Sequence, residues 1–313
     1  MQGLKRARIY IFLLITFFVI SILFFSVDKS YKIREIFDLR LTRYVLGIVT
    51  GISLSSNGTA LQTIFLNPLA EPYLVGISGG ALLGYSVAIL LGYSNFLILS
   101  FFAFLGAILT TVIIYWFSTQ RGFMDLKKLL LGGVIFNFFS YSTVLLVLTL
   151  KREGIEKILY LLWGSFGIIV TGRELEFIIL GLFIVVVCAI VYFLFNRSFD
   201  VLSLGEEEAY SIGVNVDFMR KLTFVLSSIS TGIIISIVGA IGFIGLISPH
   251  IARLLGARRH FDIFSVSILV GIILLLLADM SSRYLFPIEF PIGVLTSLIG
   301  VPFFFYILNK NGT

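Results

Sequence analysis

Long apolar runs, separated by short polar segments, occupy most of this chain of 313 residues. Runs of about 20 apolar residues predict membrane-spanning helices, because a helix satisfies its own backbone hydrogen bonds where water is absent. The eighth run is too short to cross alone, so the GAIGFIG segment before it is expected to be partly irregular and buried in protein. The ten predicted spans are residues 9–26, 44–65, 74–92, 95–117, 129–149, 174–195, 217–238, 244–256, 262–280 and 292–308.

Composition agrees with this pattern. Hydrophobic residues make up 58% of the chain and charged residues 13%, whereas soluble domains carry about 25% charge. The net charge of +6 fits short loops beside lipid head groups, so no nucleic-acid partner is expected. The single cysteine, Cys188, lies in an apolar run and predicts neither a disulfide nor a CxxC site. The expected fold is an all-α membrane protein with one transmembrane domain, residues 1–313.

Ten crossings place both termini on the same side of the membrane. If that side is the cytoplasm, a slight majority of the Lys and Arg residues lies in cytoplasmic segments, as the positive-inside rule favours. We therefore predict that both termini are cytoplasmic.

Two segments of the chain resemble each other, because a glycine is followed ten residues later by a proline in each. Matching elements five helices apart cross the membrane in opposite directions, and inverted repeats with Gly- or Pro-interrupted helices are typical of transporters. We predict inverted halves at roughly residues 44–149 and 217–308. The predicted hinge residues are Gly58, Pro68, Gly239 and Pro249.

Motifs for ATP binding and for zinc-dependent hydrolysis are missing from the sequence. It contains no GxxxxGK[ST] loop and no HExxH, so ATP-driven work would need another polypeptide. We expect no catalytic residue, no metal site and no resident cofactor. The best-buried acid is Asp279, and pairing with Arg283 or another arginine is a more ordinary role for it than proton relay.

The segment SLGEEEAYSIGV, residues 203–214, is the longest polar insertion between helix ends on the predicted inner side. Ser203 and Glu206 have the spacing of a capping box. Glu206, Glu207 and Glu208 fall in the first turn, where the helix dipole favours negative charge. The segment is therefore predicted to be a short surface helix. Two roles stay open for it: a well-capped surface helix with no partner, or a lever that docks on a cytoplasmic partner.

On the predicted outer side, Arg40 and Arg43 are three residues apart and share a helix face, and Arg283 lies on the same side. Such arginines anchor helices at the lipid interface. Because guanidinium groups bind carboxylates in a bidentate manner, they also suit a socket for acidic residues of an external protein.

Two strings of residues, NPLAEP at 67–72 and GFIGLISPHIAR at 242–253, together with the polar helix, resemble the permease family of ABC importers for iron-siderophores, haem and cobalamin, the FecCD or type II importer permeases. The resemblance covers nearly the whole chain. It implies two permease subunits around a central pathway, two cytoplasmic ATPase subunits that bind the ATP and Mg²⁺, an external substrate-binding protein, and the plasma membrane of a prokaryote. Where many members have Pro between two arginines, this chain has Thr42.

The resemblance also implies roles for individual residues. The residues implied to couple the permease to the ATPase are Leu204, Gly205, Glu206, Glu207 and Glu208. Those implied to dock the binding protein are Arg40, Arg43 and Arg283. Those implied to line the translocation pathway, on the fifth and tenth spans, are Asn137, Ser140, Tyr141, Thr143, Thr296 and Ser297.

The predicted function is a homodimeric permease that moves an intact metal chelate inward. The two pathway spans contain no His, Cys, Asp or Glu, and bare metal ions need such ligands. An iron-siderophore is the first expectation, with haem and cobalamin as alternatives. Two other classes stay open: an ATP-independent secondary carrier that depends on Asp279, and a membrane scaffold or membrane-embedded enzyme.

Overall fold

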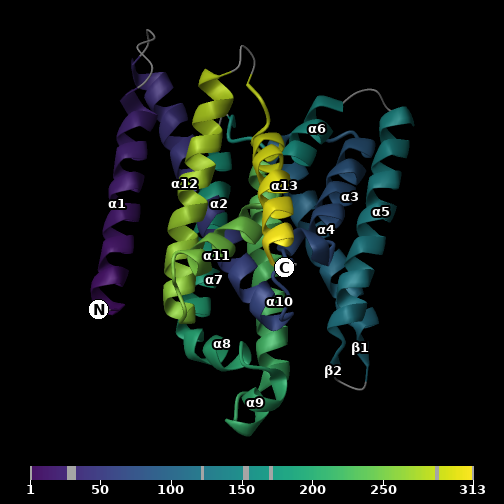
Figure 1. Ribbon diagram of the computed structural model, residues 1–313. Coiled ribbons are helices and arrows are strands. Elements are labelled where there is room, and N and C mark those ends of the chain that lie inside the picture. The colour runs from purple at the N-terminus through teal and green to yellow at the C-terminus, as the bar shows by residue number, and fades with distance from the viewer. Residues whose placement is uncertain are drawn as a thin grey trace.

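The computed structural model describes residues 2–26, 33–120, 123–150, 155–168, 172–285 and 289–311, and these segments are almost entirely helical (Figure 1). Ten helices lie at the positions of the ten predicted spans. They are α1 (Gln2–Ser26), α2 (Ile33–Ile64), α3 (Ile77–Leu90), α4 (Phe96–Ser118), α5 (Leu126–Leu150), α7 (Arg173–Leu194), α10 (Val216–Val238), α11 (Ile244–Leu254), α12 (His260–Tyr284) and α13 (Ile292–Asn311).

Shorter elements connect these helices. Four are helical: the 3-10 helix η1 (Pro72–Val75), α6 (Ile155–Trp163), α8 (Asn196–Leu202) and α9 (Glu206–Ser211). The strands β1 (Thr119–Gln120) and β2 (Phe123–Met124) pair antiparallel between α4 and α5. The structure is thus all-α apart from this small hairpin.

Length and apolar character make six helices of the described segments able to cross a membrane, namely α1, α4, α5, α7, α10 and α12. The apolar helix α3 and the apolar part of α13 are shorter. The count of ten crossings therefore stays a prediction. The N-terminal end of α1 and the C-terminal end of α13 both point toward the side of α8, α9 and the hairpin (Figure 1).

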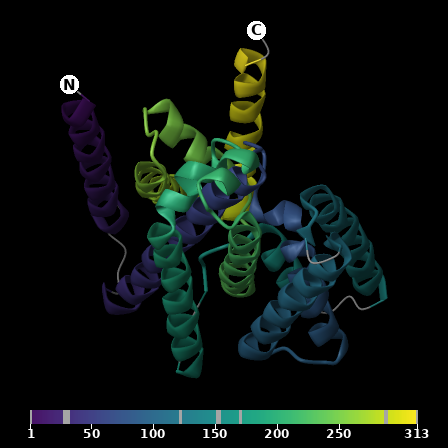
Figure 2. The same cartoon turned by 90° about the horizontal axis from the view of Figure 1, so that it is seen from below.

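Helix α2 is the central element, since it packs against α7, α10, α11 and α12. Helices α3, α4 and α5 form a group on one side of α10, and α1, α2 and α12 lie on its other side (Figure 2). Gly84 and Gly106 allow α3 and α4 to approach closely, because a Cβ at Gly84 would lie 2.1 Å from the Phe102 carbonyl oxygen. Small residues permit this close packing, which drives helix association in lipid.

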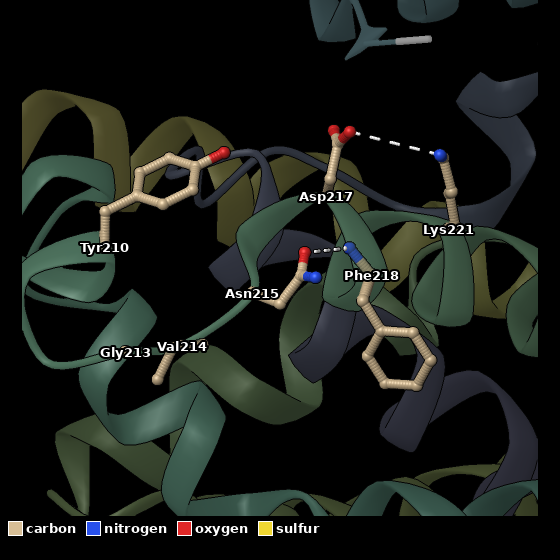
Figure 3. A pocket seen from close by; sticks show the side chains of 7 residues that line it. All are labelled: Tyr210, Gly213, Val214, Asn215, Asp217, Phe218 and Lys221. Atoms are coloured by element: carbon tan, nitrogen blue, oxygen red, sulfur yellow. Dashed lines mark hydrogen bonds and ion pairs between the residues drawn. The ribbon is translucent and has the colours of Figure 1, made fainter.

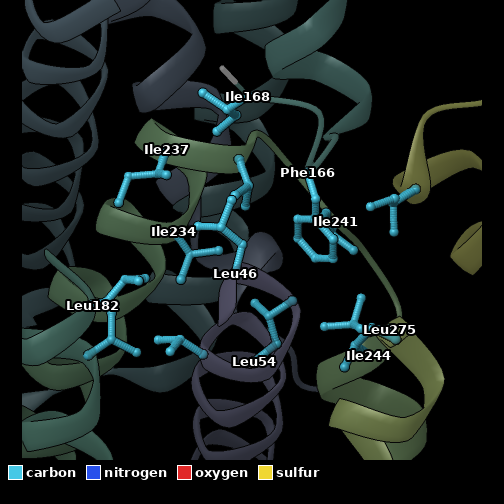
Figure 4. Close-up of a cluster of buried hydrophobic side chains, with 14 of the residues drawn as sticks. Leu46, Leu54, Phe166, Ile168, Leu182, Ile234, Ile237, Ile241, Ile244 and Leu275 are labelled. Carbon is cyan, nitrogen blue, oxygen red and sulfur yellow. The ribbon is translucent and has the colours of Figure 1, made fainter. Parts of the chain in front are cut away.

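Buried aliphatic side chains fill the space between α2 and α10 (Figure 4). Leu46, in the first half of α2, shares a cluster with Ile234 near the end of α10. Ile64, at the end of α2, shares another with Val216 at the start of α10. The two helices therefore run antiparallel, and the inverted repeat stays a prediction.

The four predicted hinge residues differ in local structure. Gly58 lies within the unbroken helix α2, whereas Gly239 ends α10 with a φ of +80°. Pro68 lies between helices, whereas Pro249 is inside α11. Both α2 and α10 are followed by an irregular segment and then a shorter helix, although the matched residues take different positions in it. The hinge roles stay a prediction.

Candidate functional site

A network of arginines and carboxylates lies at the end of the molecule opposite α9. Arg43 of α2 donates from Nε to Asp279 of α12 at 3.2 Å and forms a bidentate pair with Glu289 at 3.0 and 2.9 Å. Arg283 also forms an ion pair with Asp279, at 3.0 Å. Asp279 is fully buried. The predicted pairing of Asp279 with Arg283 is confirmed, and its second partner is Arg43.

The three predicted docking arginines point inward. Arg40 is buried and donates to the Phe25 carbonyl oxygen at 3.1 Å. The Arg283 guanidinium lies over the Phe24 ring, 4.4 Å from its centroid. These arginines do not form an open socket in this structure, because each is held by its own chain. Their role in docking an external protein stays a prediction.

Glu289 places an exposed carboxylate at this end. Glu289, in the connection between α12 and α13, keeps 55% of its side chain exposed. The hydrogen bond from Arg43 is the main cause that lowers the pKa of the Glu289 carboxyl below its ordinary value. An external carboxylate that binds Arg43 would therefore compete with Glu289.

The helical conformation is interrupted between α10 and α11. The segment that follows α2 holds this break in the helix in place. Phe243 adopts a left-handed backbone with a φ of +70°, which is strained for a residue with a side chain. Glu71 accepts the backbone N–H of Phe243, and the Tyr73 hydroxyl accepts the N–H of Ile241 at 3.0 Å. The Phe243 ring packs on α13, where a Cβ at Gly300 would lie 2.4 Å from it.

Glu71 is a residue whose role sequence reasoning missed. It is part of the NPLAEP string used for the family resemblance, but no role of its own was predicted for it. Its Oε2 is buried, with no hydrogen-bond partner among the residues that the structure describes. The signal available in the sequence was a carboxylate between two apolar stretches, since buried carboxylates in membrane proteins are costly and therefore informative.

Buried polar side chains join α2 to both halves of the broken helix. Asn57 donates to the Ser230 and Thr231 hydroxyl groups of α10 at 2.7 and 3.0 Å. On α11, the Ser248 hydroxyl donates to the Ser55 hydroxyl at 2.8 Å. Gly58 packs against α11 so closely that a Cβ would lie 1.8 Å from the Gly245 carbonyl oxygen. This interface fixes the position of the break relative to α2.

The predicted pathway residues fall into two groups. Asn137 of α5 accepts the Gly79 N–H at 3.0 Å and donates to the Tyr73 carbonyl at 2.9 Å, so it holds the start of α3. Ser140 and Thr296 are buried. Tyr141 is exposed, and Thr143 and Ser297, like Asn137, are partly exposed. The pathway role of all six stays a prediction, and the two buried members are the least accessible in this structure.

Around these positions, the uncovered faces of α5 and α13 are strongly apolar. Their large exposed side chains include Phe138, Phe139, Leu298 and Ile299.

At the other end, α9 projects from the helix bundle (Figure 1). The predicted capping box is wrong: Ser203 ends α8 and donates to the Asp200 carbonyl, and Gly205, with a φ of +135°, precedes the helix. A glycine is needed for this backbone, since other residues rarely adopt it. The three glutamates do occupy the first turn.

The glutamates of α9 differ in their surroundings. Glu206 forms an ion pair with Arg220 of α10, so α9 is tied to the long helix that leads to the break. Glu207 and Glu208 are exposed. Of the predicted coupling residues, Leu204 is exposed as well.

A hollow of about 590 Å³ lies between α9 and the start of α10 (Figure 3). Asn215 begins α10 and accepts the Phe218 N–H at 2.9 Å, and Asp217 faces Lys221 across the next turn. Tyr210 and Phe218 also line this hollow, and both are exposed. Exposed aromatic side chains next to charges are typical of a protein–protein interface.

Comparison with known proteins identifies the chain. The model of the FecCD transport family matches residues 9–310. The chain belongs to this family. It is 37% identical over 274 residues to the cobalamin import system permease protein BtuC of Halobacterium salinarum, covering 87% of this chain and 73% of that protein. It is 33% identical over 290 residues to the Fe(3+)-citrate import system permease protein YfmD of Bacillus subtilis, covering 91% and 84%.

A solved structure agrees with the family assignment. An inward-facing conformation of an ABC transporter, described by its authors as a presumed metal-chelate type, superposes with a TM-score of 0.86 at 29% identity, over 97% of this chain and 99% of that one. The FecCD chain described here is therefore an ABC transporter permease subunit. Its family and its apolar helices make it a multi-pass protein of the prokaryotic inner membrane.

Proposed function

We propose that this FecCD permease carries an intact metal chelate into the cytoplasm as part of an ATP-driven importer. The observation that carries the proposal is the α9 surface: a projecting acidic helix with exposed aromatic neighbours, in a chain whose family consists of ABC permeases. We assign the α9 side to the cytoplasm, with both termini there, and the Arg43 side to the exterior.

An iron-siderophore is the first substrate, with haem and cobalamin as alternatives. Relatives named for Fe(3+)-citrate and cobalamin import support a chelate. Helices α5 and α13 offer aromatic, aliphatic and hydroxyl side chains and no His, Cys, Asp or Glu. Such walls let a bulky complex pass, whereas a bare cation needs charged or imidazole ligands.

The working assembly has two copies of this chain, two cytoplasmic ATPase subunits and an external substrate-binding protein. The uncovered apolar faces of α5 and α13 suit the second copy, with the pathway between the subunits. ATP and Mg²⁺ bind to the ATPase subunits, and this chain holds no cofactor of its own.

A continuous series of contacts leads from α9 to the pathway. Glu206 ties α9 to Arg220 of α10. Helix α10 ends at the break, where Phe243 packs on Gly300 of α13. Movement of α9 by the ATPases would therefore reach α13 through packed elements, which is how rigid helices transmit alternating access.

Uptake into proteoliposomes tests this function. The chain is reconstituted with its ATPase and binding protein, and labelled ferric siderophore, haem and cobalamin are compared with and without ATP. We expect ATP-dependent uptake of one chelate. Uptake that persists without ATP would replace the proposal with a secondary carrier, for which Asp279 and Glu71 are the carboxylates to substitute first.

The double variant Glu207→Lys plus Glu208→Lys tests the α9 surface in the same assay. We expect uptake to fall by at least about tenfold, because both charges face an acceptor site on the ATPase. Glu176→Lys is the matched control, since this exposed glutamate at the start of α7 lies at the opposite end of the chain's long helices. Equal uptake by the double variant and the control would contradict coupling through α9.

A further inference from the structure

A second polar hollow, of about 490 Å³, lies on the α9 side, where α1, α8 and the start of α12 meet. It is separate from the α9 surface and from the pathway helices. Its lining residues are Arg6, Asn196, Arg197, Asp200, Arg259, Phe261 and Asp262.

The two carboxylates in this hollow already have partners within the chain. Asp262 forms an ion pair with Arg6 and accepts the Tyr10 hydroxyl at 3.2 Å, which also fastens α1 to α12. Asp200 accepts the backbone N–H of His260 at 2.6 Å and lies 2.9 Å from that residue's Nδ1.

Arg197 and Arg259 are exposed in this hollow, and within the described part of the chain neither has an ion-pair partner. With Arg6, the hollow holds three guanidinium groups against two carboxylates. A guanidinium fork matches the geometry of a phosphate group, to which it donates two parallel hydrogen bonds. The hollow therefore favours a ligand with a phosphate anion.

The apolar surroundings indicate where that anion is attached. Phe261 lines the hollow and is exposed, and its ring lies 5.7 Å from that of Phe193 on α7. Leu194 and Ile190, in the last turns of α7, are exposed as well. The polar hollow thus adjoins the apolar surface of the helices, which suits a head group that carries acyl chains. A soluble anion would make no use of that surface.

We propose that this hollow binds the head group of an anionic phospholipid from the leaflet on the α9 side. Arg197 and Arg259 hold the phosphodiester, and the acyl chains lie along Phe261 and the end of α7. Basic pockets between membrane helices recognise anionic head groups in this way. The bound lipid fills the space between α1 and α8.

Native mass spectrometry of the detergent-purified chain tests the site, with phosphatidylglycerol and phosphatidylcholine of identical acyl chains as probes. We expect phosphatidylglycerol to bind at least about tenfold more tightly. The variant Arg197→Gln plus Arg259→Gln should lose this preference. Lys127→Gln plus Lys128→Gln, which removes two exposed charges at the start of α5 on the same side, should keep it. Equal binding of the two lipids, or an equal loss in both double variants, would overturn the proposal.

Two further measurements test the charge requirement and the source of the anion. Arg197→Lys plus Arg259→Lys retains the charges, so it should bind phosphatidylglycerol more tightly than the Gln variant does; equal binding of these two variants would contradict the proposal. Inorganic phosphate, added alone, distinguishes the source of the anion. If it binds as tightly as phosphatidylglycerol, the hollow is a site for a soluble anion and the lipid proposal is wrong.

Discussion

The two ends of the molecule use charge in opposite ways. At the α9 end, Glu207 and Glu208 are exposed beside aromatic side chains. At the other end, Arg43 and Arg283 turn inward around the buried Asp279. Charge that faces solvent is available to a partner, whereas charge that is paired inside holds the helices of its own chain together. The comparison shows that a charged motif near a helix end is not by itself a docking surface.

Removal of the central carboxylate should have the largest effect. Asp279→Asn leaves the Arg43 and Arg283 guanidinium groups without their shared buried partner. We expect the free energy of unfolding to fall by about 3 to 5 kcal/mol, because breaking a buried ion pair strands charge in a poorly solvated place. Denaturant unfolding in micelles measures it. A loss below about 1 kcal/mol would mean that this end is as solvated as the α9 end.

Glu71, between the two ends, should give the next largest effect. Glu71→Ala removes the acceptor of the Phe243 N–H and should destabilise the chain by about 1 to 3 kcal/mol, the cost of an unsatisfied buried donor. Glu71→Gln keeps a carbonyl acceptor and should lose less. The same unfolding measurement compares the two variants; equal losses would show that the hydrogen bond does not hold the break.

The positions of the ten helices could be predicted from the sequence, because apolar runs are a local property. Some ends could not: α2 begins at Ile33, well before the predicted residue 44, and α12 continues to Tyr284 rather than 280. Both extensions carry arginines whose side chains are paired or packed within the protein. Tertiary contacts keep these polar turns helical where hydropathy alone predicts a loop.

The orientation of the side chains at the site could not be predicted from the sequence. Arg43 and Glu289 are 246 residues apart, and nothing local indicates that they pair. The break after α10 was expected from GAIGFIG, but besides Gly239 it places Phe243, a residue with a side chain, at a positive φ. Only the fold brings Glu71 to that residue. The resemblance supplied roles for Arg40, Arg43 and Arg283, and the structure shows how each is held.

The smallest expected effect is a pH dependence at the Arg43 end. Because the pKa of Glu289 is lowered in the folded chain, its pairing with Arg43 contributes stability above the ordinary value of 4.5 and loses it as the pH falls through the lowered folded pKa. The side chain is half exposed, so we expect the contribution to be at most about 1 kcal/mol.

Glu289→Gln isolates this contribution. The melting temperature of the wild-type chain should exceed that of the variant at pH 7, and the difference should shrink as the pH falls below 4.5. Glu207→Gln, at the exposed α9 end, is the control: it should give no such convergence, since among the described residues Glu207 makes no ion pair. A difference that stays constant for Glu289→Gln would show that Arg43 is held by Asp279 alone, and Glu289 would then be as available to a partner as the glutamates of α9.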